Sequence, residues 1–126
     1  TVAVLGLTFK PGTNDLREAP SIINVGILLD DGAIVKAYDP VAEIEFDKLY
    51  PGKIKYCESP EQALEEADLC MIFTEWEEIK NLAPQAFCNK MKKPVILDGR
   101  NCFQIKELEK LPLIYDSIGR RTVRNI

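Results

Sequence analysis

The chain has 126 residues, the size of one domain with a single hydrophobic core. Twenty acidic residues against sixteen basic ones give a net charge of −4, which argues against a nucleic-acid partner because neutralising phosphates needs a basic face. No apolar run approaches the roughly 20 residues of a membrane span and no charged-then-apolar leader precedes Thr1, so we expect a soluble, cytoplasmic protein without a membrane partner.

The first half of the chain predicts a strand, a helix and a second strand. The apolar residues 2–5 end at Gly6, which indicates a buried strand followed by a long loop. Pro20 suits the first turn of a helix, and residues 22–29 carry apolar side chains at helical spacing. Residues 33–38 form the next predicted strand. This order implies a right-handed crossover and parallel pairing.

The middle of the chain continues the alternation. Residues 54–57 predict a short strand. Ser59 then serves as an N-cap, with Pro60 in the first helical turn and Gln62 at the capping-box position. The continuous apolar run 69–73 is typical of a strand covered on both faces.

The last part of the chain predicts short helices within 77–91, a strand at 95–97, a helix at 104–110 and a strand at 113–115. The basic remainder, 117–124, reads as a loop or an edge extension. Regular alternation of strands and helices predicts a single α/β domain, a three-layer α/β/α sandwich with a doubly wound, mostly parallel, Rossmann-like sheet. That fold hosts many functions, so function must come from the site.

Two cations follow predicted strands that lie far apart in the sequence. Lys10 comes after the first strand and Arg100 after the strand at 95–97. Ligands gather at the carboxyl ends of strands in such sheets, so both can meet at one edge, beside Phe9. An arginine fork and a lysine point charge suit a diphosphate with an attached ring. The alternative is that both are ordinary surface cations paired with nearby acids.

Neither a metal site nor a catalytic thiol is predicted. The four cysteines lie far apart without a Cys-x-x-Cys pair, and the chain has no histidine. Cys70 reads as a small core residue. Cys102, near Arg100, is the only thiol with a hint of the cationic setting that reactivity needs. We expect reduced, structural thiols.

The glycine pattern does not indicate the main dinucleotide site. Gly6 and Gly12 are too far apart for the Gly-x-Gly-x-x-Gly turn that seats a pyrophosphate. Without that turn, Asp39 is better explained as a turn or helix-cap residue before Pro40 than as a ribose ligand.

Three further residues near the predicted edge have simple structural explanations. Trp76 follows a buried strand and favours packing over stacking on a base. Asp98 either orders its loop or pairs with Arg100. Glu75 belongs with its acidic neighbours to the solvated start of a helix, where negative charge favours the helix dipole.

Four motifs carry a family resemblance. In chain order they are GLTFKPGTNDLREAPS at 6–21, AYDP at 37–40, ADLCMIFTEW at 67–76 and ILDGRNCF at 96–103. Together they resemble the carboxy-terminal, UDP-sugar-binding domain of the UDP-glucose/GDP-mannose dehydrogenase family, over residues 1–126. Within that family the motifs look like those of the UDP-glucose 6-dehydrogenases. The UDP-N-acetylmannosamine and GDP-mannose dehydrogenases have similar patterns and remain alternatives.

The resemblance implies roles for four residues. Phe9, Lys10 and Arg100 match positions that contact the UDP-sugar in that family. Arg17 matches an arginine that reaches the NAD cofactor held by another part of the enzyme. From its own position, Arg17 has a second interpretation, an ion pair with Asp15 or a neighbouring glutamate that orders the loop.

The resemblance also implies what lies outside this chain. The family oxidises C6 of a UDP-hexose in two NAD-dependent steps, and the catalytic cysteine, its partners, the glycine-rich NAD turn and a dimer-forming helix would all precede Thr1. The chain starts inside a predicted strand without a methionine, as a domain excised from a longer, homo-oligomeric enzyme would. We therefore expect no catalytic residue here and weak UDP-sugar binding. The alternative from another class is a free-standing nucleotide-sugar-binding module.

Overall fold

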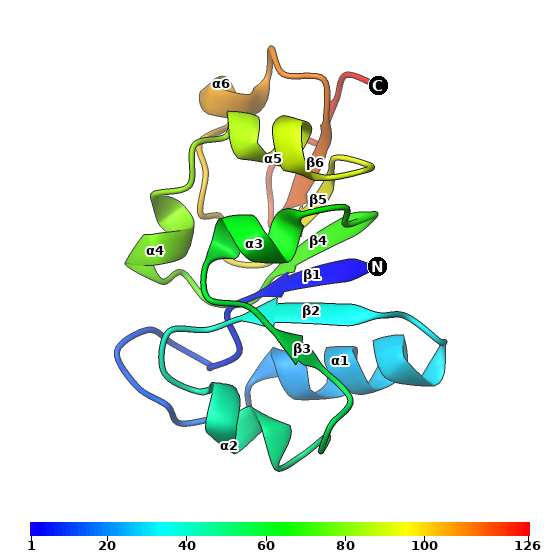
Figure 1. The fold of residues 1–126 in the computed structure, drawn as a ribbon. Helices are drawn as coiled ribbons and strands as arrows, with labels where there is room; N and C mark the ends of the chain where they lie inside the picture. The colour runs from blue at the N-terminus through cyan, green and yellow to red at the C-terminus, as the bar shows by residue number, and fades with distance from the viewer.

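The computed structural model describes residues 1–126, which form one seven-stranded sheet (Figure 1). The strands are β1 (Val2–Leu5), β2 (Val35–Tyr38), β3 (Lys55–Tyr56), β4 (Leu69–Ile72), β5 (Val95–Asp98), β6 (Ile114–Ser117) and β7 (Val123–Arg124). Their spatial order is β3-β2-β1-β4-β5-β6-β7. All neighbours pair in parallel except β6 and β7. The Rossmann-like, doubly wound fold is confirmed, and the basic tail is an edge strand.

Six helices connect the strands: α1 (Pro20–Asp30), α2 (Glu43–Asp47), α3 (Pro60–Leu64), α4 (Glu77–Lys80), α5 (Gln85–Lys90) and α6 (Ile105–Leu108). α1 and α2 bury Val25 and Phe46 against one face of the sheet. The other four helices pack on the opposite face, where Leu64, Phe87 and Leu108 are buried. None of the helices has the length and apolar character needed to cross a membrane.

Local sequence signals explain where these helices begin. The hydroxyl of Ser59 accepts a hydrogen bond from the amide of Gln62 at 3.1 Å, and the Gln62 side chain accepts one from the amide of Glu58 at 2.7 Å. The predicted N-cap Ser59 is therefore confirmed, whereas Gln62 bonds the amide of Glu58 and not the cap amide that a capping box requires. Pro20 occupies the start of α1, where its missing N–H costs nothing. The short helix α2 lies in a stretch for which the sequence predicted no element.

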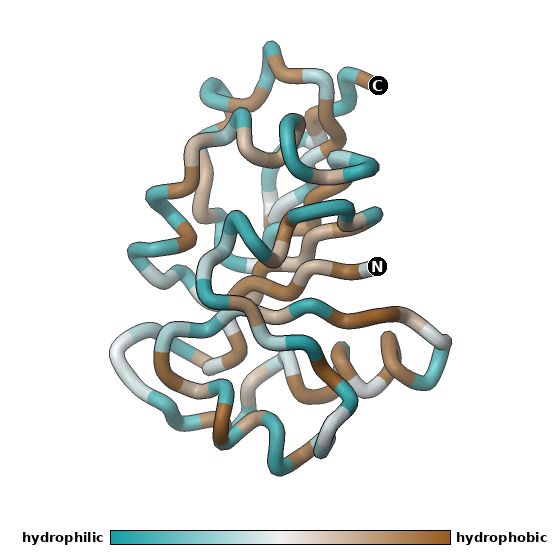
Figure 2. The backbone as a smooth tube through the Cα atoms, in the orientation of Figure 1, coloured by the Kyte–Doolittle hydropathy of each residue, from teal (hydrophilic) through white to brown (hydrophobic).

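The core lies on both sides of β1. Val2 and Val4 point to the α1 side, while Ala3 and Leu5 point to the other side, and all four are buried. Hydrophobic segments accordingly follow the central strands, and hydrophilic segments follow many of the outer turns (Figure 2). The prediction that residues 69–73 are covered on both faces is wrong for β4: its burial alternates, because no helix of this chain covers its α1 side.

Candidate functional site

The candidate site lies where the chain order of the sheet reverses. β1 stands between β2 and β4, so the loops after β1 and β4 leave the same edge in different directions, and such a point is where ligands bind in open α/β sheets. Gly6 makes the close approach of these loops possible. Its φ is +83°, and a Cβ there would lie 2.5 Å from the Thr74 Cβ and 2.7 Å from the Thr74 amide nitrogen. Any side chain at Gly6 would push the two loops apart.

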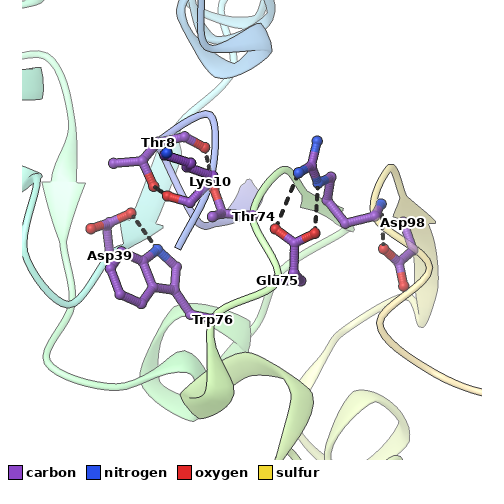
Figure 3. Close-up of polar contacts among 8 residues, drawn as sticks. Thr8, Lys10, Asp39, Thr74, Glu75, Trp76 and Asp98 are labelled. Atoms are coloured by element: carbon purple, nitrogen blue, oxygen red, sulfur yellow. Dashed lines mark hydrogen bonds and ion pairs between the residues drawn. The ribbon is translucent and has the colours of Figure 1, made fainter. Parts of the chain in front are cut away.

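Buried hydrogen bonds hold the loops together (Figure 3). The Thr74 hydroxyl donates to the Thr8 carbonyl at 2.5 Å. One carboxylate oxygen of Asp39 accepts from the Leu7 amide at 2.8 Å and from the Trp76 indole at 3.1 Å. The ends of β1, β2 and β4 are thereby fixed to one another. Groups carried on these loops are held in place before any ligand arrives.

The structural interpretations of Asp39 and Trp76 are confirmed. The second oxygen of Asp39 accepts from the amides of Val41 and Ala42, at 2.9 and 2.8 Å, as a turn-capping residue does. Trp76 is 8% exposed and packs in the core below the edge. Neither side chain is free to contact a nucleotide.

The loops that carry Lys10 and Arg100, 90 positions apart in the sequence, approach each other through Phe9, the neighbour of Lys10. Arg100 also pairs with an acid, as the surface-cation alternative predicted, and a meeting of the two cations themselves remains a prediction. The guanidinium carbon of Arg100 lies 5.7 Å from the centre of the Phe9 ring. Its Nε and Nη2 donate to Glu75, at 3.3 and 3.2 Å, so two of its five N–H donors are used. Lys10 is exposed on the same loop as Phe9 and forms no ion pair.

The loop that carries Arg100 is built on Asp98. This buried carboxylate accepts from the amides of Arg100 and Cys102, at 2.9 and 2.8 Å, and from the Tyr115 hydroxyl at 2.6 Å. Arg120 in turn donates to the Tyr115 oxygen at 2.7 Å. Of the two roles predicted for Asp98, the structure shows loop ordering: it bonds the Arg100 backbone, not the guanidinium.

The electrostatics explain which groups are charged at this edge. Partial burial opposes ionisation of Glu75, but a hydrogen bond from its own backbone amide and the nearby Arg100 outweigh it and lower the pKa of Glu75. Glu75 is therefore an anion that neutralises part of the Arg100 charge. The sequence prediction of a merely solvated helix start was wrong for this residue. Lys10 was predicted as a site residue because it follows the carboxyl end of a strand. Glu75 follows the carboxyl end of β4, so the same criterion would have identified it.

The thiols do not form a reactive or metal-binding group. All four cysteines are free, and no cluster of three metal-ligating side chains exists in the chain. Burial raises the pKa of Cys102 to about 12, and the neighbouring Asp98 adds to the shift. Burial also raises the pKa of Cys70 well above its ordinary value. The structure therefore gives Cys102 no activated thiolate.

Arg17 lies apart from the cluster formed by Arg100, Phe9 and Glu75. Its guanidinium donates two hydrogen bonds to the Asp15 carboxylate oxygen Oδ2, from Nη2 at 2.6 Å and from Nε at 3.0 Å. The Arg17 side chain is 89% exposed. Hydrogen bonds from the Arg17 side chain and backbone lower the pKa of Asp15 to about 2. This is the loop-ordering ion pair that the sequence allowed. A contact with a cofactor remains a prediction.

The edge itself is open. None of the hollows on the chain's surface is lined by Phe9, Lys10 or Arg100. Three N–H donors of Arg100, the exposed Phe9 ring and the unpaired Lys10 ammonium are together suited to an anion with a flat or apolar group attached.

Comparison with known proteins gives the family context. The profile described as "UDP-glucose/GDP-mannose dehydrogenase family, UDP binding domain" matches residues 3–105. The UDP-glucose 6-dehydrogenase TuaD of Bacillus subtilis (strain 168) is 43% identical over 124 residues, which cover 98% of this chain and 27% of that protein. A UDP-glucose 6-dehydrogenase of Pseudomonas aeruginosa is 40% identical over 125 residues. The chain thus spans about a quarter of the length of these relatives.

Solved structures agree with this assignment. A UDP-glucose dehydrogenase from Pyrobaculum islandicum superposes with a TM-score of 0.73 at 30% identity, over 91% of this chain and 24% of that chain. An NDP-N-acetyl-D-galactosaminuronic acid dehydrogenase from Methanosarcina mazei Go1 gives a TM-score of 0.75 at 28% identity, over 95% of this chain. The fold is therefore shared with dehydrogenases whose names give different sugars.

Proposed function

The chain belongs to the UDP-glucose/GDP-mannose dehydrogenase family, and from that premise we propose that it is the UDP-sugar-binding part of a longer NAD-dependent UDP-glucose 6-dehydrogenase. The parent enzyme would oxidise UDP-glucose to UDP-glucuronate in two steps at C6. UDP-glucose is favoured over UDP-N-acetylmannosamine and GDP-mannose because the relatives at 40–43% identity are UDP-glucose 6-dehydrogenases. The parent is expected to be a cytoplasmic homo-oligomer.

One observation carries the proposed binding role: Arg100 is positioned by contacts at its backbone and on one side of its guanidinium, yet only two of its five N–H donors are used. Glu75 occupies the Nε and Nη2 side of the guanidinium, the guanidinium carbon lies over the Phe9 ring, and Asp98 bonds the Arg100 backbone amide. The remaining N–H groups of Arg100 can therefore donate hydrogen bonds to diphosphate oxygens, and little side-chain entropy is lost on binding. Lys10 would add a second positive charge to the same anion.

This chain's residues do not fit the principal NAD site. Its first loop lacks the Gly-x-Gly-x-x-Gly turn that lets a pyrophosphate approach a helix start, so no glycine-lined seat for a pyrophosphate precedes α1. NAD, which supplies the hydride acceptor, would be bound mainly by another part of the parent. Arg17 is proposed only as an auxiliary contact. To reach a cofactor it would extend from its exposed position beside Asp15.

Calorimetric titration of this chain with UDP-glucose, UDP, GDP and NAD tests the proposal. We expect UDP and UDP-glucose to bind, GDP to bind more weakly, and NAD to give no measurable heat. Lys10→Ala should weaken UDP binding severalfold, whereas Lys48→Ala, at an exposed position away from the edge, should leave it unchanged. Equal weak heats for all four ligands and both variants would contradict the proposal and leave a free-standing module of another specificity.

A further inference from the structure

Half of one sheet face has no cover in this chain. The parallel register places six side chains of β4, β5 and β6 on the same face as Val2 and Val4: Leu69, Met71, Val95, Leu97, Ile114 and Asp116. None of these six is buried, and Leu97 is 38% exposed. On the opposite face of the same strands, Cys70 and Ile96 are fully buried. Leu69 and Met71 of β4 are partly buried against the α1-side core, so the cover on this side thins across β4 and is lost over β5, where Leu97 is exposed.

The topology causes this gap. Right-handed crossovers from β1 through β2 to β3 place α1 and α2 on one face, and crossovers in the other direction, from β4 to β6, place α4, α5 and α6 on the opposite face. α3 fills the remaining space on that opposite face. No helix of this chain can therefore reach the α1 side of β4 and β5 (Figure 1).

The uncovered surface is apolar and hollowed. A cavity of about 230 Å³ lies at its carboxyl end, lined in part by Met71, Leu97 and Ile118, and Ile118 is 63% exposed. A contiguous apolar surface of this kind on a sheet marks an interface.

We propose that a helix of the parent chain, from the segment that leads into β1, packs over β4 and β5 beside α1. The inference depends on the proposed function, in which the chain is one part of a longer dehydrogenase; its relatives are almost four times as long. The Val2 amide donates to the Ile34 carbonyl and the Thr1 carbonyl accepts from the Asp68 amide, both at 2.8 Å, so a segment entering β1 arrives between β2 and β4, at the border of the uncovered half of the face. Packed helices lie about 8–10 Å apart, roughly two strand spacings, and α1 already covers β1 and β2.

The first test uses the two methionines of this chain in the full-length parent enzyme. Met71 lies on the uncovered face, and Met91, the C-cap residue of α5, is buried in the core of the other face at 6% exposure. After a pulse of hydrogen peroxide, mass spectrometry measures the sulfoxide at each. We expect Met71 to oxidise within about threefold of the rate of Met91, because the docked helix shields it. Oxidation of Met71 at ten or more times that rate would mean an open surface and would overturn the proposal.

The second test separates an intrachain helix from a second copy of the chain. If protection of Met71 persists when the parent is diluted below its oligomer dissociation range, the cover comes from its own chain. Loss of protection on dilution would assign the surface to a neighbouring subunit and contradict the proposal. UDP-glucose binding by the same preparation is measured in parallel, so that a failure of the proposed function is distinguished from a failure of the docking.

Substitutions in the parent give an independent result. Leu97→Lys places a charge under the proposed helix and should lower the melting temperature by several degrees. Ile44→Lys, at a position of α2 that is 75% exposed, should shift it by no more than about one degree. Equal melting temperatures for the two variants would refute the docked helix.

Discussion

Replacement of Arg100 by alanine should weaken UDP-glucose binding by about 10- to 100-fold. The guanidinium retains three N–H donors after Glu75 has taken two, and one charge-assisted hydrogen bond contributes about 1.5–3 kcal/mol. The loss is not confined to that bond. Without Arg100, the Glu75 carboxylate faces the diphosphate unpaired and adds repulsion.

A double-mutant cycle isolates that repulsion. The Arg100–Glu75 pair is partly exposed, with side chains 26% and 31% accessible, so the pair itself contributes at most about 1 kcal/mol. Glu75→Ala alone should therefore change the affinity by no more than about fivefold. In the double variant, removal of the unpaired carboxylate should restore part of the binding that Arg100→Ala loses.

Calorimetric titration of UDP-glucose provides the assay, with Arg121→Ala as the matched control. Arg121 is also an arginine in an ion pair, 2.8 Å from Glu109, but it lies outside the candidate site. Circular dichroism confirms that each variant is folded. If Arg100→Ala and Arg121→Ala bind UDP-glucose with the same affinity, Arg100 does not receive the phosphates and the reasoning is refuted.

Three further changes have defined outcomes. Gly6→Ala should lower the free energy of unfolding by about 2–5 kcal/mol, because the new Cβ adds left-handed backbone strain and overlaps the neighbouring loop. Gly12→Ala, at φ +84° with nothing within 4 Å of the new Cβ, should lower it by only about 1–2 kcal/mol. Equal losses in urea denaturation would contradict the overlap at Gly6. Cys102, with its pKa raised to about 12, has only about one thiolate in ten thousand at pH 8, so iodoacetamide should label it far more slowly than free cysteine; rapid labelling would contradict its buried setting. Arg17→Ala should raise the pKa of Asp15 from about 2 toward 3.8, measured by NMR titration, and should leave the affinity for UDP unchanged. A pKa of Asp15 that stays near 2 would contradict the Arg17–Asp15 ion pair.

The sequence alone determined the order of the elements and the edge at which the site forms. Strand and helix signals are local: an apolar run that ends at Gly6, or a cap at Ser59, does not depend on distant residues. Because parallel strands bring their carboxyl ends to one edge, the proximity of Arg100 to Phe9 on the Lys10 loop followed from the alternation.

Only the tertiary structure decided which partners the charged groups take. Asp15 and Glu18 were equally available to Arg17 in the sequence, and Glu75 was one of three nearby acids, so the pairs depended on side-chain distances that no spacing rule contains. The cover of β4 was decided in the same way. A continuous apolar run predicts a strand that is buried on both faces. Which segment covers each face of β4 depends on the direction of the crossovers and on what else packs there.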